Sequence, residues 1–126
     1  MKNFKYILLM VTALAFFGCK KNQLGGKSNI KGRVEHHDKA IPHARVYIKF
    51  NAKDFPGTDV SKYDTYIDAD HNGNFLISNI YRGDYYFYAI GVDDAIAAPG
   101  TVKGGIYLKV KMLKEITGFV VPVTED

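Results

Sequence analysis

From Ile30 onward the chain alternates apolar and polar residues with a period of two, and this feature most constrains its fold. Val46 and Ile48, for example, alternate with Tyr47 and Lys49. Successive side chains of a β-strand point to opposite faces, so each such run places one apolar row on one side of a strand. No stretch of ten residues has the period of an amphipathic helix. The pattern therefore predicts an all-β domain.

Turn residues separate the alternating runs. Asn72-Gly73 is the strongest hairpin signal, because both central residues of a type I′ turn take positive φ. About seven short strands with such turns indicate a β-sandwich. The longest irregular connection is expected at residues 51–63. A last strand is expected at residues 118–123, and Pro122 is compatible with an edge position for it. The expected core comprises Val34, Val46, Ile48, Ile67, Phe75, Ile77, Tyr85, Phe87, Leu108 and Val110.

The first eighteen residues have the pattern of an export signal. After a short basic start, Tyr6–Phe17 is a run of twelve largely apolar residues. A bilayer span needs about 20 residues, so this run suits a signal-peptide core better than a membrane helix. Gly18 then precedes Cys19, the only cysteine. The arrangement resembles the lipobox of bacterial lipoproteins, although Phe16 stands where leucine is usual.

This resemblance implies a lipid anchor. Residues 1–18 would be removed as a lipoprotein signal peptide, and Cys19 would carry diacylglycerol on its sulfur. Two or three acyl chains make such an attachment lasting. The polar residues 19–29 are expected to form a flexible tether, and residues 30–126 the folded domain. We expect a lipid-anchored protein of the bacterial cell envelope, in the outer membrane. A plain secretory signal, or a short membrane helix with an incidental free thiol, is the alternative.

Charge and cysteine content exclude several classes of protein. The net charge is +4, and removal of Lys2 and Lys5 with the signal peptide lowers it to +2. This surplus is too small to indicate nucleic-acid binding. A single cysteine excludes a disulfide framework and a cysteine-rich zinc module. The chain also carries no strong catalytic signature, so neither an enzyme nor a small-molecule substrate is expected.

Four segments match a known family pattern in order and at normal spacing: Ile30–Val34, Ala40–Ile48, Asp68–Ile80 and Gly83–Tyr85. They fit G-x-V, I-P-x-A-x-V, D-x-x-G-x-F-x-I-x-x-I and G-x-Y, so the chain resembles the carboxypeptidase regulatory-like domain, also called transthyretin-like. The resemblance implies a seven-stranded Greek-key β-sandwich of the prealbumin-like type without catalysis. In that family the module is an accessory beside peptidases or transporters, or a small lipoprotein.

The expected function is therefore structural or protein-interacting. A lipid-anchored module of this kind would present a sheet face or an edge strand to another envelope protein. The alternative is a ligand-binding module, for a glycan or for calcium, and each ligand has its own candidate residues.

The calcium candidate is the segment Asp68–Asn72. Asp68, Asp70 and Asn72 fit D-x-D-x-N-G, in which alternate oxygens converge on the ion. An EF-hand loop needs a bidentate Glu at its twelfth position, where this chain has Asn79. The loop is incomplete, and a plain hairpin turn has the same appearance. No other cofactor is expected.

The glycan candidate is a set of tyrosines. Tyr47, Tyr86, Tyr88 and Tyr107 fall on the polar-facing registers of their strands. Exposed aromatic rings on a sheet face can stack on sugars or contact a protein. Cross-strand pairing that only stabilises the sheet is the alternative interpretation.

The segment Glu35-His36-His37-Asp38 is a further possible metal site. Adjacent residues of a strand point to opposite faces, so His36 and His37 would not share an ion unless the turn curls. His43 would have to fold back across a hairpin to join them. We interpret the segment as a solvated turn.

Overall fold

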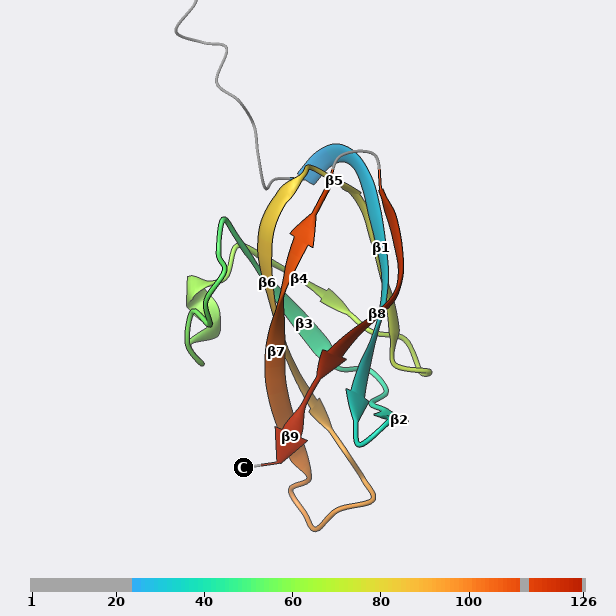
Figure 1. Cartoon of the computed structure of the whole chain (residues 1–126). Helices are drawn as coiled ribbons and strands as arrows, with labels where there is room; N and C mark the ends of the chain where they lie inside the picture. The colour runs from blue at the N-terminus through green and yellow to red at the C-terminus, as the bar shows by residue number, and fades with distance from the viewer. Residues whose placement is uncertain (1–23, 112–113, 126) are drawn as a thin grey trace, which may run out of the picture.

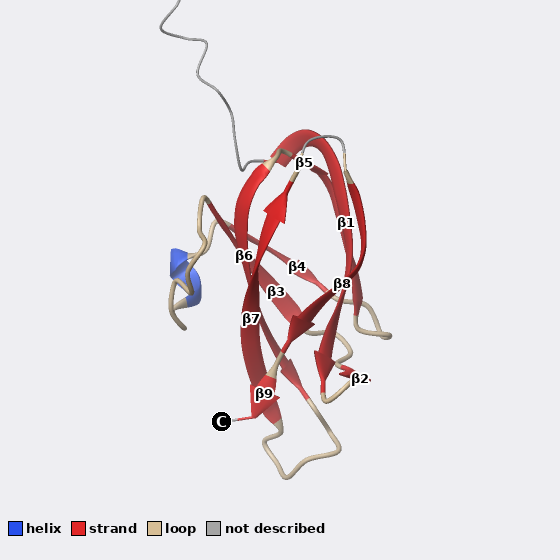
Figure 2. Ribbon diagram, in the orientation of Figure 1, coloured by secondary structure: helices blue, strands red, loops and turns tan. Residues whose placement is uncertain are grey.

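A computed structural model describes residues 24–111 and 114–125 (Figure 1). The expected signal peptide and Cys19 lie outside these residues. The described chain forms strands and one short 3-10 turn, η1 (Val60–Lys62) (Figure 2). The strands are β1 (Leu24–His36), β2 (Lys39–Ala40), β3 (Arg45–Phe50), β4 (Thr65–Asp68), β5 (Asn74–Ile80), β6 (Gly83–Val92), β7 (Thr101–Val110), β8 (Glu115–Pro122) and β9 (Thr124–Glu125). None of the described residues belongs to a helix long and apolar enough to cross a membrane.

The strands build two packed sheets, which confirms the predicted all-β sandwich. In sheet A, β1 pairs with β5 and β2 along one edge and with β8, in parallel, along the other. Sheet B has the order β4-β3-β6-β7-β9. Strands β3, β4 and β5 follow one another, and β6 returns beside β3, which is a Greek-key connection. β8 pairs only with β1 among the described strands, so the last long strand lies at a sheet edge.

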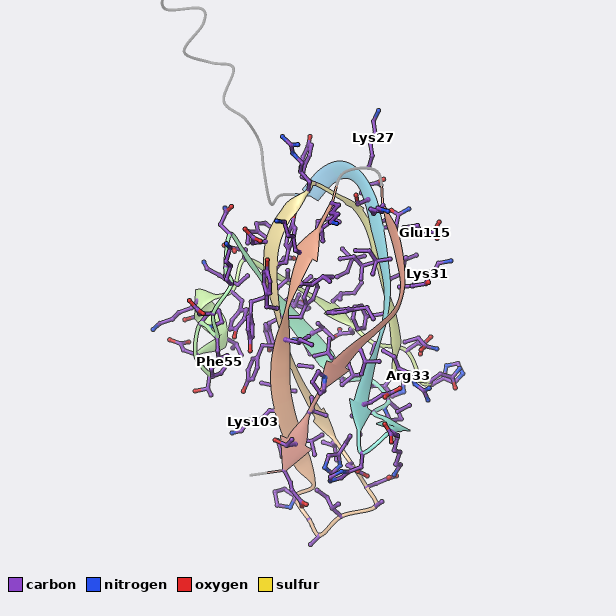
Figure 3. The ribbon with its side chains drawn as sticks, in the orientation of Figure 1. Lys27, Lys31, Arg33, Phe55, Lys103 and Glu115 are labelled. Atoms are coloured by element: carbon purple, nitrogen blue, oxygen red, sulfur yellow. The ribbon has the colours of Figure 1, made fainter. Side chains whose placement is uncertain are left out.

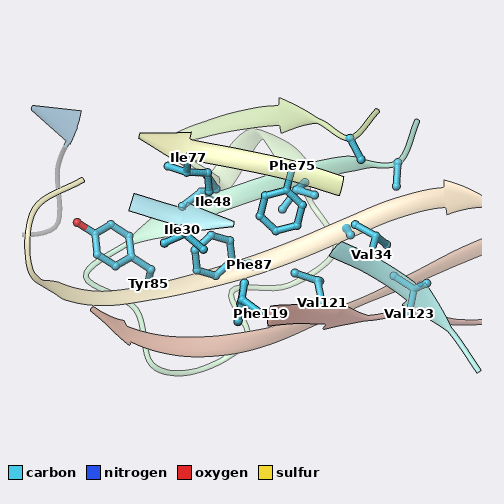
Figure 4. Close-up of a cluster of buried hydrophobic side chains, with 14 of the residues drawn as sticks. Ile30, Val34, Ile48, Phe75, Ile77, Tyr85, Phe87, Phe119, Val121 and Val123 are labelled. Atoms are coloured by element: carbon cyan, nitrogen blue, oxygen red, sulfur yellow. The ribbon is translucent and has the colours of Figure 1, made fainter. Parts of the chain in front are cut away.

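Apolar side chains fill the space between the sheets (Figure 4). Of the ten predicted core residues, Ile67 and Leu108 are only partly buried and the other eight are buried. Phe119 joins the sheets, with its ring 5.0 Å from that of Phe87 and 6.4 Å from that of Phe75. Gly32 permits this packing, because a Cβ there would lie 2.2 Å from the ring of Phe75.

β1 begins earlier than expected. The sequence placed residues 19–29 in a tether, but Leu24–Asn29 form the start of the first strand. Ser28 is buried, and its hydroxyl donates to the carbonyl of Lys111 and accepts from the amide of Lys114. The small and polar residues of this segment have no apolar period, so the sequence pattern did not reveal a strand. Pairing with β5 and the bonds of Ser28 to the connection between β7 and β8 hold the segment in place.

The turns also differ from expectation. Asn72-Gly73 does not form a type I′ turn, because only Gly73 has positive φ, at 73°. The carboxylate of Asp70 accepts from the amides of Asn72 and Asn74, which favours a longer loop. Two consecutive positive φ angles occur instead at His37 (48°) and Asp38 (64°), where β1 turns into β2.

Candidate functional site

The four predicted tyrosines share the outer face of sheet B. The register pairs Tyr47 with Tyr88 and Tyr86 with Tyr107. The four side chains therefore lie on one face, as the alternation predicted. Tyr88, however, is only 2% exposed, and the other three are half-buried. The prediction that these rings are freely exposed is wrong for Tyr88.

The cause is the long connection between β3 and β4, residues 51–64, which folds back over the face. Phe55 packs against Tyr88 and Tyr86 with ring centroids 5.4 and 5.8 Å away. Tyr63 stacks on Tyr88 at 5.7 Å with an interplanar angle of 19°. Burial raises the pKa of Tyr63 to about 12. The sequence marked this connection only as irregular, although its two aromatic residues were the signal that it packs on something.

Hydrogen bonds hold the connection in this place. The hydroxyl of Tyr63 donates to the carbonyl of Gly57 at 2.9 Å. The carboxylate of Asp64 accepts from the backbone amide of Phe50 at 2.7 Å. Asp59 caps η1 by accepting from the amide and hydroxyl of Ser61. The connection is thus a built element of the site.

Between this connection and β7 lies a hollow of about 270 Å³, which we call the aromatic cleft. Phe55 stands at its rim with 49% of its surface exposed, and Figure 3 shows Phe55 and Lys103 projecting on the same side of the molecule. The cleft is lined by Phe55, Thr58, Tyr86, Tyr88, Lys103, Gly104 and Gly105. Burial also raises the pKa of Tyr86.

The remaining predicted tyrosines lie away from the cleft. Tyr107 donates to the carboxylate of Asp84 at 2.5 Å, a bond that raises the pKa of Tyr107. Tyr47 packs against Tyr63 and against Tyr66, which is 54% exposed. The cleft therefore unites two of the four predicted tyrosines with Phe55, which the sequence analysis did not select.

The predicted calcium residues have other partners. Arg45 donates to both oxygens of Asp68, at 2.7 and 3.2 Å, and holds the pKa of Asp68 below its usual range. Likewise, hydrogen bonds from the backbone amides of Asn74 and Asn72 hold the pKa of Asp70 below its usual range. A calcium ion here would have to compete with a guanidinium and with the amides that form the turn. The geometry therefore favours the structural interpretation of Asp68, Asp70 and Asn72.

A larger hollow, of about 630 Å³, lies on the outer face of sheet A. Lys31 and Arg33 line it, and both are in ion pairs, with Glu115 at 3.3 Å and with Glu35 at 3.6 Å. Figure 3 shows Lys31, Arg33 and Glu115 on the side opposite Phe55. The hollow lacks an exposed aromatic ring, since Phe75 and Phe119 at its floor belong to the core. Its size alone does not make it the better candidate site.

A buried hydrogen-bonded pair, His36 and Asp93, lies at the end of β1. His36 Nδ1 lies 2.8 Å from Asp93 Oδ2, and both side chains are 4% exposed. Asp93 also accepts from Lys39 Nζ at 3.0 Å and from the amide of Ala95 at 2.9 Å. These bonds, that from His36 foremost, hold the pKa of Asp93 far below its usual range. The sequence analysis considered His36 and missed Asp93, which is 57 residues away.

Comparison with known proteins identifies the fold. No family model matches the chain, and no curated protein matches it. A solved structure from Pseudomonas aeruginosa, described as a putative carbohydrate binding protein, is 14% identical, covers 80% of this chain and 91% of its own, and has a TM-score of 0.55. A DUF3823 family protein from Parabacteroides merdae is 15% identical over 79% of this chain, with a TM-score of 0.50. This chain spans about half of that second protein, 47%. At such identities the likeness shows a shared β-sandwich fold.

Proposed function

We propose that the protein is a non-catalytic, lipid-anchored module of the bacterial cell envelope, in the outer membrane, that binds a glycan at the aromatic cleft. Cys19 is its attachment point. The observed two-sheet sandwich is compatible with a carboxypeptidase regulatory-like module, whose family role is accessory. The Pseudomonas aeruginosa protein of similar fold, described as a putative carbohydrate binding protein, is compatible with the same ligand class.

One observation carries the choice of ligand, namely the half-exposed ring of Phe55 resting on Tyr86 and Tyr88. A sugar ring has an apolar C–H face and a rim of hydroxyl groups. The exposed face of Phe55 offers an apolar platform, and Thr58 and Lys103 line the same cleft with polar atoms. Binding sites combine these two elements, an apolar lining and a few placed polar groups.

Retention on a panel of immobilised polysaccharides tests this proposal. The wild type should be retained on at least one glycan, and Phe55→Ala should abolish the retention, because it removes the exposed platform. Tyr66→Ala is the matched control, since Tyr66 is exposed on the same sheet face but does not line the cleft. A wild type that no glycan retains, or equal losses in the two variants, would refute glycan binding.

The anchor is tested separately. Mass spectrometry of the protein purified from bacterial membranes should show residue 19 as the first residue, carrying fatty acid. Cys19→Ala should leave the signal peptide uncleaved at this site and the protein without lipid. An unmodified chain that retains residues 1–18 would contradict the anchor and leave the cleft unaffected.

A protein partner is the second candidate, and the open edge of β7 favours it. β9 pairs with β7 only at Val102 and Lys103, so the described strands leave the edge beyond Lys103 without a partner. Such an edge is able to accept a strand from another chain. A photo-crosslinker at Lys109 in intact cells should capture one envelope protein reproducibly, whereas one at Lys53 should not. Absence of a reproducible product at Lys109 would eliminate this candidate.

A further inference from the structure

A histidine with an unsatisfied buried nitrogen lies where β1 ends. His36 is 3% exposed, and its Nδ1 lies 2.8 Å from Asp93 Oδ2. Its Nε2 is buried and lacks a hydrogen-bond partner among the described residues. Buried polar atoms in folded proteins nearly always have a partner. The unsatisfied Nε2 of His36 is therefore a candidate to bind a ligand.

The surroundings of His36 determine which nitrogen is available. Asp93 accepts from Lys39 and from the amide of Ala95 on one oxygen, and its other oxygen faces His36 Nδ1. Asp93 acts as an acceptor throughout, so Nδ1 carries the proton and donates. With the proton on Nδ1, the lone pair of Nε2 is available to bind a metal ion. Metal-binding histidines almost always donate their second ring N–H to a carboxylate or carbonyl in this manner.

Two further ligand groups face the same point. One ligand atom from each of His36, His37 and Glu125 lies within 4.8 Å of the others. His37 is turned toward His36 by its positive φ of 48°, and the ring centroids are 4.2 Å apart. Glu125 arrives on β9, where it pairs with Val102 of sheet B. The sequence analysis allowed His36 and His37 to share an ion only if the turn curls, and it does, because β1 ends at His36 and His37 has positive φ. The interpretation of this segment as a solvated turn is wrong for His36, which is buried.

We propose that His36, His37 and Glu125 bind a divalent transition-metal ion, zinc in the first instance, and that Asp93 orients His36 for this role. Two imidazole nitrogens and one carboxylate oxygen form a ligand set that zinc uses, with water in the fourth position. Calcium and magnesium prefer sites built from oxygen alone. The ligand chemistry therefore selects the zinc class over the hard cations.

Such an ion would fasten the two sheets together at one end. His36 ends β1 of sheet A, His37 follows it in the turn to β2, and Glu125 belongs to β9 of sheet B. Figure 1 shows β2 and β9 at the same end of the molecule, and the amide of Val123 donates to the carbonyl of Glu35 at 2.9 Å. β9 has only two residues, so an ion at Glu125 would add a contact that its short ladder lacks.

The test is a zinc titration of the full-length protein, purified in detergent and stripped of metal with EDTA. Calorimetry should show one zinc ion bound per chain, and zinc should raise the melting temperature, because it binds only the folded state. Calcium chloride at the same concentration should leave the melting temperature unchanged. Failure of zinc to bind at a tenfold excess over protein would overturn the proposal.

Variants locate the ion. His37→Ala and Glu125→Gln change exposed side chains, so both should fold, as checked by circular dichroism. Each should weaken zinc binding at least about tenfold, in line with the effect of disturbing a metal site. His43→Ala and His71→Ala change the other two histidines of the chain and should bind zinc as the wild type does. Equal weakening in His71→Ala, or unchanged binding in His37→Ala, would refute the site.

Discussion

The outer faces of the two sheets are built on different principles. On sheet B, residues 51–64 cover the strands, and Tyr63 and Phe55 bury Tyr88 to 2% exposure. On sheet A the outer face is open, with Leu76 48% exposed between charged side chains. An ion pair between Lys31 and Glu115 links β1 to β8 on this face, and both side chains are 59% exposed.

The two faces therefore differ in role: the covered face of sheet B adds buried aromatic contacts, and the open face of sheet A is left to solvent. Covering one face of sheet B creates a second apolar cluster outside the main core, and the cover leaves an opening, the aromatic cleft. Burial of aromatic surface stabilises more than exposed ion pairs do. Variants on the two faces should therefore differ in effect.

The largest effect is expected for Tyr88→Ala. This change removes a buried ring together with its contacts to Tyr63 and Phe55. The free energy of unfolding should fall by about 3 kcal/mol or more, as for other truncations of buried aromatic residues. Urea unfolding followed by circular dichroism measures the change.

The matched control is Leu76→Ala on sheet A. Leu76 also points outward, from the edge strand β5, but it is 48% exposed, and the expected loss is about 0.5 kcal/mol or less. Similar losses for Tyr88→Ala and Leu76→Ala would show that the cover over sheet B contributes nothing to stability.

Alkaline pH should lower the stability contributed by the covered face of sheet B. Burial raises the pKa of Tyr63 from 10.0 to about 12. The unfolded chain therefore loses this proton near pH 10, while the folded chain keeps it until about pH 12. By linkage, the free energy of unfolding should fall as the pH rises from 10 to 12.

Tyr63→Phe provides the comparison for this pH dependence, because it keeps the ring and removes the ionisable hydroxyl. Other tyrosines with raised pKa values, such as Tyr85 and Tyr86, remain in both proteins. Urea unfolding at about pH 9 and pH 11 should therefore show a smaller decrease in the variant. Equal decreases would mean that Tyr63 is not buried as described.

Period-two patterning predicted the fold well, because the sandwich buries one side of each strand. Eight of ten proposed core residues are buried, since each lies on an inward register. The two exceptions, Ile67 and Leu108, pack only partly against the core. The start of β1 was missed because Leu24–Asn29 contains glycines and polar residues, and pairing with distant Ile80 decides its conformation.

The candidate sites were less predictable, because they depend on side chains far apart in the sequence. Alternation placed Tyr86 and Tyr88 on the outer face, but no pattern states that Phe55 returns over them. Likewise, His36 acquires its role from Asp93, which lies 57 residues further along. The interpretation of His36 and His37 as a diverging pair assumed a regular strand, which the positive φ of His37 interrupts.

A smaller loss is expected for Tyr63→Phe at neutral pH. The ring and its stacking on Tyr88 remain, and only the hydrogen bond from the hydroxyl to the carbonyl of Gly57 is removed. One such bond contributes about 1 kcal/mol, so urea unfolding should show a loss of that size. A loss as large as that of Tyr88→Ala would indicate that the hydroxyl, rather than ring packing, holds the connection down.

The smallest effect is expected on the open face, for Glu115→Gln. This change removes the ion pair with Lys31 at 3.3 Å and keeps the size of the side chain. Because both partners are mostly exposed, water and salt already weaken their attraction, and the free energy of unfolding should change by less than about 1 kcal/mol. The change should shrink further in 1 M sodium chloride. A large, salt-independent loss would instead mean that the outer face of sheet A is held as firmly as that of sheet B, and the contrast between the two faces would not hold.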